Sequence, residues 1–78
     1  MQPGDKVVFL KNDYGEKNYV YTKDNRAISI QPLQFFIKIK DSWIDKLLGR
    51  SMYRFEKSDL EVNLKQFENT VWLKKVEE

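Results

Sequence analysis

The segment Gln34-Phe35-Phe36-Ile37-Lys38-Ile39-Lys40 decides the fold class, because its side chains alternate in character along an extended chain. In a β-strand, one face carries Phe35, Ile37 and Ile39, and the other face carries Gln34, Phe36, Lys38 and Lys40. Pro32 precedes the segment and suits the start of a strand or a sheet edge. The pattern predicts a strand whose face with Phe35 and Ile37 contributes to a small core.

The residues that follow this strand change to a helical period. Ser42 is suited to cap a helix, Asp45 completes a pair of the capping-box type, and Gly49 suits the helix end. We therefore predict a two-turn helix over residues 42–48, with a wide apolar stripe formed by Trp43, Ile44, Leu47 and Leu48. Trp43 and Trp72 are expected to anchor the core with Phe9. A tryptophan that is exposed becomes a candidate interface hot spot instead.

Four further short segments have the β-branched and aromatic content of strands: 6–11, 19–22, 27–30 and 51–56. Lys23-Asp24-Asn25-Arg26 supplies residues that tolerate positive φ, so we expect a hairpin between the second and third of these segments. Residues 12–18 are polar and contain Gly15, and we expect a loop there with Tyr14 at its tip. Tyr19 and Tyr21 share one face of their strand, which favours a core or cross-strand pair.

The segment after Ser58 fits two patterns. As a strand, Leu60, Val62 and Leu64 alternate with polar residues. As a helix, Ser58 and Glu61 form a capping box ahead of an apolar stripe. We favour a brief helical turn over residues 58–60 followed by extended structure, because Thr70-Val71-Trp72-Leu73 is a poor helix interior.

These elements predict a single domain over residues 1–78. Its fold class is mainly β, a β-rich α+β arrangement with one short helix near residues 42–48. The architecture that we expect is a small barrel or a strongly bent antiparallel sheet of about five strands.

Two stretches of the sequence resemble small barrel domains of the KOW and Tudor type. These are Gly4-Asp5-Lys6-Val7-Val8-Phe9-Leu10-Lys11 and Arg54-Phe55-Glu56-Lys57-Ser58-Asp59-Leu60-Glu61-Val62, separated by the glycine-bearing loop at Gly15. The resemblance covers about residues 4–62, and the helix and the segment after Leu64 depart from it. It implies an SH3-like barrel that binds nucleic acid, ribonucleoprotein or a peptide without catalysis. The implied contacts fall on Tyr14 and, less strongly, on Tyr21 and Lys38.

Composition limits the chemistry that this chain can perform. It contains no histidine and no cysteine, so the commonest catalytic groups and transition-metal ligands are missing, and a domain of 78 residues seldom encloses a deep cleft. Asp41 and Asp45 have a spacing that could hold a divalent ion, but capping already accounts for Asp45. We predict a protein that is not an enzyme and holds no metal or cofactor. We also expect a cytoplasmic location without membrane contact, because no signal or spanning segment is apparent.

The charge is small overall but concentrated in the middle of the chain. The formal net charge is +2, and residues 25–57 hold seven basic and three acidic residues. We therefore predict a binding module that engages nucleic acid or a nucleoprotein. Its expected contacts come from a basic, aromatic face: Tyr14, Tyr21, Phe36, Lys38, Lys40, Lys46, Arg50 and Arg54.

Three alternatives remain open from the sequence. The lysines could be the solvated side of ordinary elements, with Phe36 covered. The many aromatic residues favour a small protein–protein interaction module that acts as inhibitor or adaptor of a larger partner. The strand after Ser58 could also pair across a homodimer.

Overall fold

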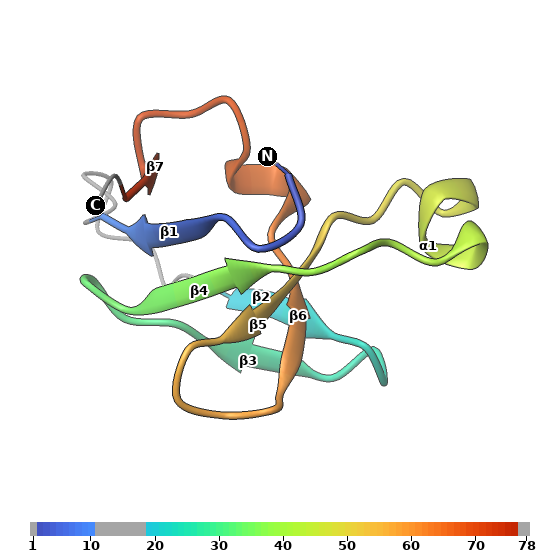
Figure 1. The fold of residues 1–78 in the computed structure, drawn as a ribbon. Coiled ribbons are helices and arrows are strands. Elements are labelled where there is room, and N and C mark those ends of the chain that lie inside the picture. Colours follow the sequence, from blue (N-terminus) through green and yellow to red (C-terminus); the bar gives the residue numbers. More distant parts are fainter. Residues whose placement is uncertain (1, 11–18, 77–78) are drawn as a thin grey trace.

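Seven short antiparallel strands form one open sheet in the computed structural model, which describes residues 2–10 and 19–76 (Figure 1). The strands are β1 (Lys6–Phe9), β2 (Tyr19–Thr22), β3 (Ala27–Ser29), β4 (Phe35–Lys38), β5 (Met52–Phe55), β6 (Glu61–Asn63) and β7 (Leu73–Lys75). Their order is β3-β2-β6-β5-β4-β1-β7. The mainly β class is confirmed. The strand count of about five is wrong for the described residues, and the sheet does not close into a barrel because no pairing joins β3 to β7.

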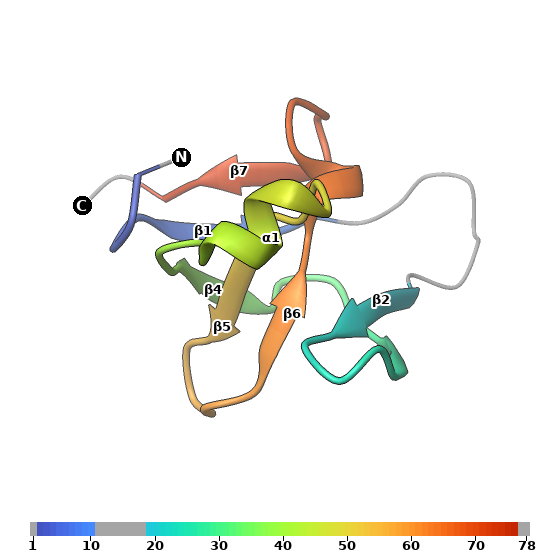
Figure 2. The same cartoon turned by 90° about the vertical axis from the view of Figure 1, so that its right-hand side faces the viewer.

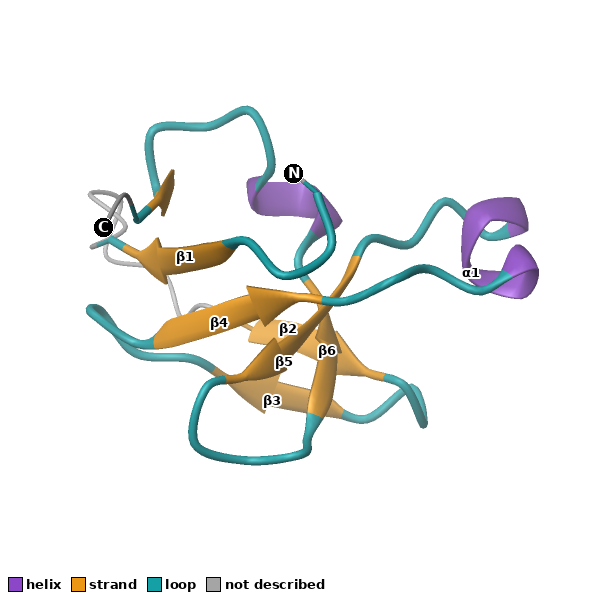
Figure 3. Cartoon of the chain, viewed as in Figure 1, coloured by secondary structure: helices purple, strands orange, loops and turns teal. Residues whose placement is uncertain are grey.

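Two helical elements accompany the sheet (Figure 3). A 3-10 helix, η1 (Lys65–Phe67), follows β6, and the α-helix α1 (Trp43–Leu47) lies between β4 and β5. Figure 1 shows the chain leaving β4, running outward to α1 and returning to β5. In Figure 2, turned by 90°, α1 is the element nearest the viewer. We call residues 39–51 the arm.

Local rules account for the turn and for the helix ends. In the β2–β3 hairpin, Asn25 has a φ of 62°, and the N–H of Thr22 donates to the carbonyl of Arg26. The predicted hairpin is confirmed. Ser42 and Asp45 form the predicted capping box, and Gly49 with a φ of 70° follows the helix.

The segment after Ser58 follows the extended alternative only in part. A turn at residues 56–57 precedes β6, so the predicted helical turn at 58–60 is wrong. The helical turn forms later, as η1, and the last strand begins at Leu73 rather than at Thr70. β6 pairs with β2 on one side and β5 on the other, and therefore offers no free edge for a dimer. Within the described residues, the free edges are β3 and β7.

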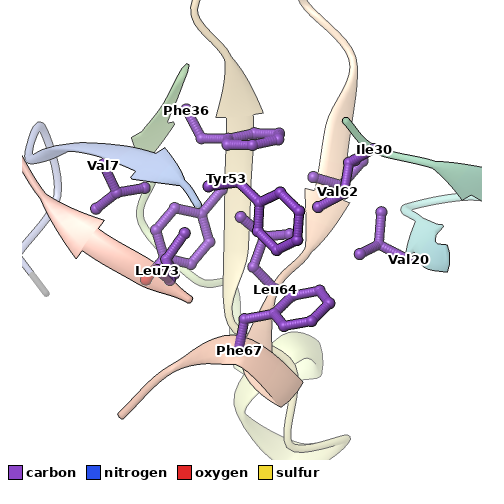
Figure 4. Packing of buried hydrophobic residues seen from close by; sticks show 10 residues of the cluster. Val7, Val20, Ile30, Phe36, Tyr53, Val62, Leu64, Phe67 and Leu73 are labelled. Atoms are coloured by element: carbon purple, nitrogen blue, oxygen red, sulfur yellow. The ribbon is translucent and has the colours of Figure 1, made fainter. Parts of the chain in front are cut away.

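The core lies on one face of the sheet and is built from side chains of almost every element (Figure 4). Phe9 packs on Phe67 with ring centroids 5.0 Å apart, and Phe67 meets Trp72 edge to face at 6.4 Å. Trp72 is thus partly buried against the core, as the sequence predicts. The buried cluster comprises Val7, Phe9, Val20, Ile30, Phe36, Tyr53, Val62, Leu64, Phe67 and Leu73.

The inward face of β4 is opposite to the predicted one. Phe36 is fully buried, whereas Phe35 is 39% exposed. Register explains the difference, because Phe36 lies directly across from Val7 on β1 and from Phe55 on β5, and its ring packs 4.7 Å from that of Phe55. The face of β4 with Phe36 and Lys38, which the sequence pattern indicates as the basic face, therefore points into the core.

Candidate functional site

The arm presents four large apolar side chains to solvent. Trp43 is 74% exposed and Leu47 is 77% exposed, and the other two members of the group are Ile44 and Leu48. Because residues three and four apart share a face of a helix, these side chains form one contiguous stripe, which we call the α1 surface. Trp43 is thus not the core anchor that the sequence predicts. It meets instead the condition under which a tryptophan becomes a candidate hot spot.

The arm is attached to the sheet through a buried lysine. The ammonium of Lys38 donates to the carbonyls of Ile39 and Met52 at 2.8 and 3.2 Å, and to Oδ1 of Asp41 at 3.0 Å. All three donors of the ammonium are therefore satisfied, which makes burial of the charge tolerable. Asp41 also accepts the N–H of Met52 at 2.9 Å, so one carboxylate joins the outgoing and the returning chain of the arm.

A second carboxylate fixes the orientation of α1. Oδ2 of Asp45 accepts from the N–H and the hydroxyl of Ser42, and the N–H of Asp45 donates back to the Ser42 hydroxyl at 3.2 Å. The hydrogen bond from the Ser42 N–H holds the pKa of Asp45 below its ordinary value. On the return path, the N–H of Arg50 donates to the Asp45 carbonyl at 2.8 Å. The α1 surface therefore stands on a polar frame and not on apolar packing.

The structure does not gather the predicted basic residues into one face. Lys38 is enclosed, and the guanidinium of Arg54 donates to the carbonyls of Phe55 and Ser58 at 3.1 and 3.3 Å. Arg50 lies 3.9 Å from a carboxylate oxygen of Asp45. Of the five basic residues in the predicted contact set, only Lys40 and Lys46, both on the arm, are exposed and form no ion pair with another described residue.

The predicted aromatic contacts are also dispersed. Phe36 is inside the core and is not available for stacking. Tyr21 is exposed, as is Tyr19, because β2 turns Val20 and Thr22 inward instead of the tyrosines. The interpretation of this pair as core residues is therefore wrong. Tyr14 lies outside the described residues.

A second exposed apolar feature lies at the start of β4, and the sequence reasoning missed it. Leu33 is 69% exposed and has a φ of 66°, a backbone region that disfavours branched side chains. Leu33 and Phe35 together line two adjacent hollows of about 300 and 560 Å³. We call this pair the Leu33–Phe35 ridge. The signal available in the sequence was a leucine directly after Pro32, where a turn often needs glycine or asparagine.

One cluster of hydroxyl and carboxylate groups has a structural explanation. Oε2 of Glu68 accepts from the hydroxyls of Ser51 and Tyr53 at 2.5 and 2.7 Å. Burial, together with the nearby Glu68 carboxylate, raises the pKa of Tyr53. Both hydroxyls donate to the same carboxylate oxygen, so the cluster ties Glu68, which directly follows η1, to Ser51 and to Tyr53 of β5.

Among residues 2–10 and 19–76, no group of three or more acidic side chains is placed to hold a metal ion. None of the helices in this part of the chain has the length and apolar character needed to cross a membrane. No protein-family model, curated protein or solved structure matched the chain.

Proposed function

We propose that this chain is a protein-interaction module that inserts the α1 surface into an apolar groove of a larger protein. The observation that carries the proposal is the exposure of Trp43 and Leu47, each about three-quarters accessible, on one face of a helix. Tryptophan is among the residues most enriched at interface hot spots. Helix-in-groove recognition uses apolar anchors at the spacing that the α1 surface has.

The frame beneath the α1 surface supports this function. Lys38, Asp41 and the Ser42–Asp45 capping box hold the arm in one conformation before any partner binds. Binding then costs little conformational entropy in the backbone, which favours affinity for an element of only five helical residues. Lys40 and Lys46 add positive charge beside the apolar stripe. A groove with an acidic rim therefore complements the arm best.

A larger partner fits the α1 surface better than a second copy does. A stable interface covers roughly 800 Å² on each partner. Four side chains on each of two facing five-residue helices supply less than this area, even when they are fully covered. A groove encloses the helix on several sides and recruits neighbouring contacts from the arm.

Nucleic-acid binding has weaker support from the geometry. Of the eight residues expected to make that contact, Phe36 and Lys38 are buried, and the guanidinium of Arg54 is bound to carbonyls of its own chain. Phosphate recognition needs cations free to displace counterions, and exposed rings are needed for stacking. Tyr21, Lys40 and Lys46 keep this property, but Tyr21 lies on β2 and the lysines lie on the arm.

The proposal is tested by site-directed photo-crosslinking in cells that produce the full chain. A benzophenone amino acid replaces Leu47 in one variant and Val71, an equally exposed residue on the loop before β7, in the matched control. We expect one protein product from position 47 that position 71 does not give. Trp43→Ala should abolish that product, and should weaken binding of the purified partner at least about tenfold in calorimetry.

Three results reject the proposal. The first is a product shared by both positions, the second is no product from position 47, and the third is a product formed only between copies of this chain. A salt titration with single- and double-stranded oligonucleotides runs in parallel. A steep salt dependence that Lys40→Glu and Lys46→Glu abolish would identify nucleic acid as the partner instead.

A further inference from the structure

The geometry points to a second binding site, in which the Leu33–Phe35 ridge takes an extended acidic peptide from a partner protein. This inference goes beyond the α1 surface and does not depend on it. The ridge lies at the beginning of β4, whereas the arm departs from the other end of that strand (Figure 1). Failure of one site therefore leaves the other intact.

The backbone of the ridge is held in a conformation that its own sequence disfavours. Leu33 has a φ of 66°, and its N–H donates to the carbonyl of Phe9 at 2.6 Å, while the N–H of Phe9 donates to the carbonyl of Gln34 at 2.9 Å. A leucine in the left-handed region is strained, and glycine or asparagine would relieve the strain. Packing does not account for the leucine, because most of its side chain faces solvent. A ligand that covers this side chain does account for it.

Two hollows flank the ridge and match the side chains of an extended peptide. The smaller hollow is lined by the ridge with Phe55, and the larger by the ridge with Val8 and Val76. Alternate side chains of an extended chain point the same way at a spacing of about 7 Å. A peptide that crosses the ridge therefore places residues i and i+2 on either side of it, with an apolar side chain in each hollow.

The charged residues that line the two hollows indicate which peptide residues should flank the two apolar side chains. Lys57 lines the smaller hollow and Lys74 lines the larger, and neither makes an ion pair among residues 2–10 and 19–76. The other charged lining groups are already compensated, since Glu56 pairs with Lys6, and Lys75 lies 3.6 Å from Asp5. The uncompensated charge at both ends of the site is positive. Carboxylates at positions i−2 and i+4 of the peptide complement it.

The aromatic ring of the ridge favours a peptide over a single-stranded nucleic acid. The ammonium of Lys6 lies 4.8 Å from the centroid of the Phe35 ring, so one face of the ring already carries a cation. Base stacking requires a free ring face, and the partner residue on the ridge is aliphatic. An apolar peptide side chain that packs next to Leu33 does not need a free ring face.

The test uses ¹H–¹⁵N spectra of the full chain titrated with acetyl-Glu-Ser-Leu-Ser-Leu-Ser-Glu-amide, which places Glu, Leu, Leu and Glu on one face when extended. We expect saturable shifts at the amides of Val8, Leu33, Phe35 and Lys74. Two control peptides carry lysine in place of glutamate or serine in place of leucine, and we expect neither to give these shifts. A control peptide that binds as well as the probe would overturn the proposal, and so would a probe whose shifts fail to saturate or centre elsewhere.

A matched set of variants separates binding from folding. Leu33→Gly suits the positive φ, so the melting temperature should stay or rise while peptide affinity falls at least about tenfold. Lys74→Glu should weaken binding to a similar extent. Leu47→Ala on the α1 surface should leave peptide binding unchanged, which distinguishes this site from the proposed function. Unchanged affinity in Leu33→Gly, or the same amide shifts with a thymidine oligonucleotide, would refute an acidic peptide as the ligand.

Discussion

The inner face of β4 and the arm that follows this strand treat apolar and charged side chains in opposite ways. At the inner face, the protein buries Lys38 beside Phe36 and Tyr53, with the ammonium 5.2 Å from the centroid of the tyrosine ring. On the arm that follows, it exposes Trp43 and Leu47. The contrast shows that hydrogen-bond partners decide where a side chain goes as much as its own polarity does. Lys38 is buried because three oxygens accept hydrogen bonds from its ammonium. Trp43 is exposed because carboxylates hold the arm away from the core.

The largest loss of stability is expected from a substitution in the core. Phe36→Ala removes a fully buried ring, and it should lower the free energy of unfolding by about 3–5 kcal/mol. Urea unfolding followed by circular dichroism measures this change. Phe35→Ala, on the exposed face of the same strand, is the matched control and should cost clearly less. Equal losses in the two variants would contradict the observed orientation of β4.

Asp41 holds the junction between β4 and the arm. Asp41→Ala leaves the buried ammonium of Lys38 without its anionic partner and the N–H of Met52 without an acceptor. We expect a loss of about 2–3 kcal/mol in urea unfolding. Asp59→Ala, at an exposed position, should change stability by less than about 0.5 kcal/mol. A loss in Asp41→Ala no larger than in this control would show that the junction does not support the fold.

A smaller loss of stability is expected on acidification, with one contribution from the arm and another from the segment before β1. The N–H of Ser42 lowers the pKa of Asp45, and the N–H of Gln2 lowers that of Asp5, each from an ordinary value of 3.8. Because the folded pKa is the lower one, each carboxylate contributes stability that is complete above pH 3.8 and is lost as the pH falls through the folded pKa. Stability should therefore decline as the pH falls below about 3.8.

Two single variants test whether Asp45 and Asp5 cause this loss of stability in acid. Asp45→Asn and Asp5→Asn should each remove part of the pH dependence of the free energy of unfolding in urea. Both variants should be less stable than the parent protein at pH 6. The Asp45 contribution should also appear locally, as faster amide exchange in residues 43–49 below pH 4. A parental pH profile in both variants would contradict this assignment.

The smallest effect on stability is expected at the α1 surface. Trp43→Ala should change the free energy of unfolding by less than about 0.5 kcal/mol, because the side chain is mostly in water already. Fluorescence quenching by acrylamide provides an independent measurement. Trp43→Phe leaves Trp72, which is partly shielded, so quenching should fall, whereas Trp72→Phe should raise it. A large loss of stability in Trp43→Ala would place this residue in the core after all.

Local chemistry was predictable from the sequence, and long-range geometry was not. The Ser42–Asp45 capping box, Gly49 and the Asn25 turn follow from rules that act within a few residues, and all three are confirmed. The inward face of β4 depends on what lies opposite in β1 and β5, and both of its faces carry a phenylalanine, so alternation alone gave the wrong face. The exposure of Trp43 depends in turn on Asp41 reaching the N–H of Met52, eleven residues away.

The triple coordination of the Lys38 ammonium has a consequence for chemical labelling. An amine that is hydrogen-bonded to three oxygens and shielded from solvent reacts slowly with acylating reagents. Surface lysines such as Lys40 and Lys46 are acylated rapidly. Acetylation of Lys38 therefore requires the arm to detach from the sheet. The rate at which this single amine is acylated, followed by mass spectrometry, reports how often the arm opens while the remaining strands stay paired.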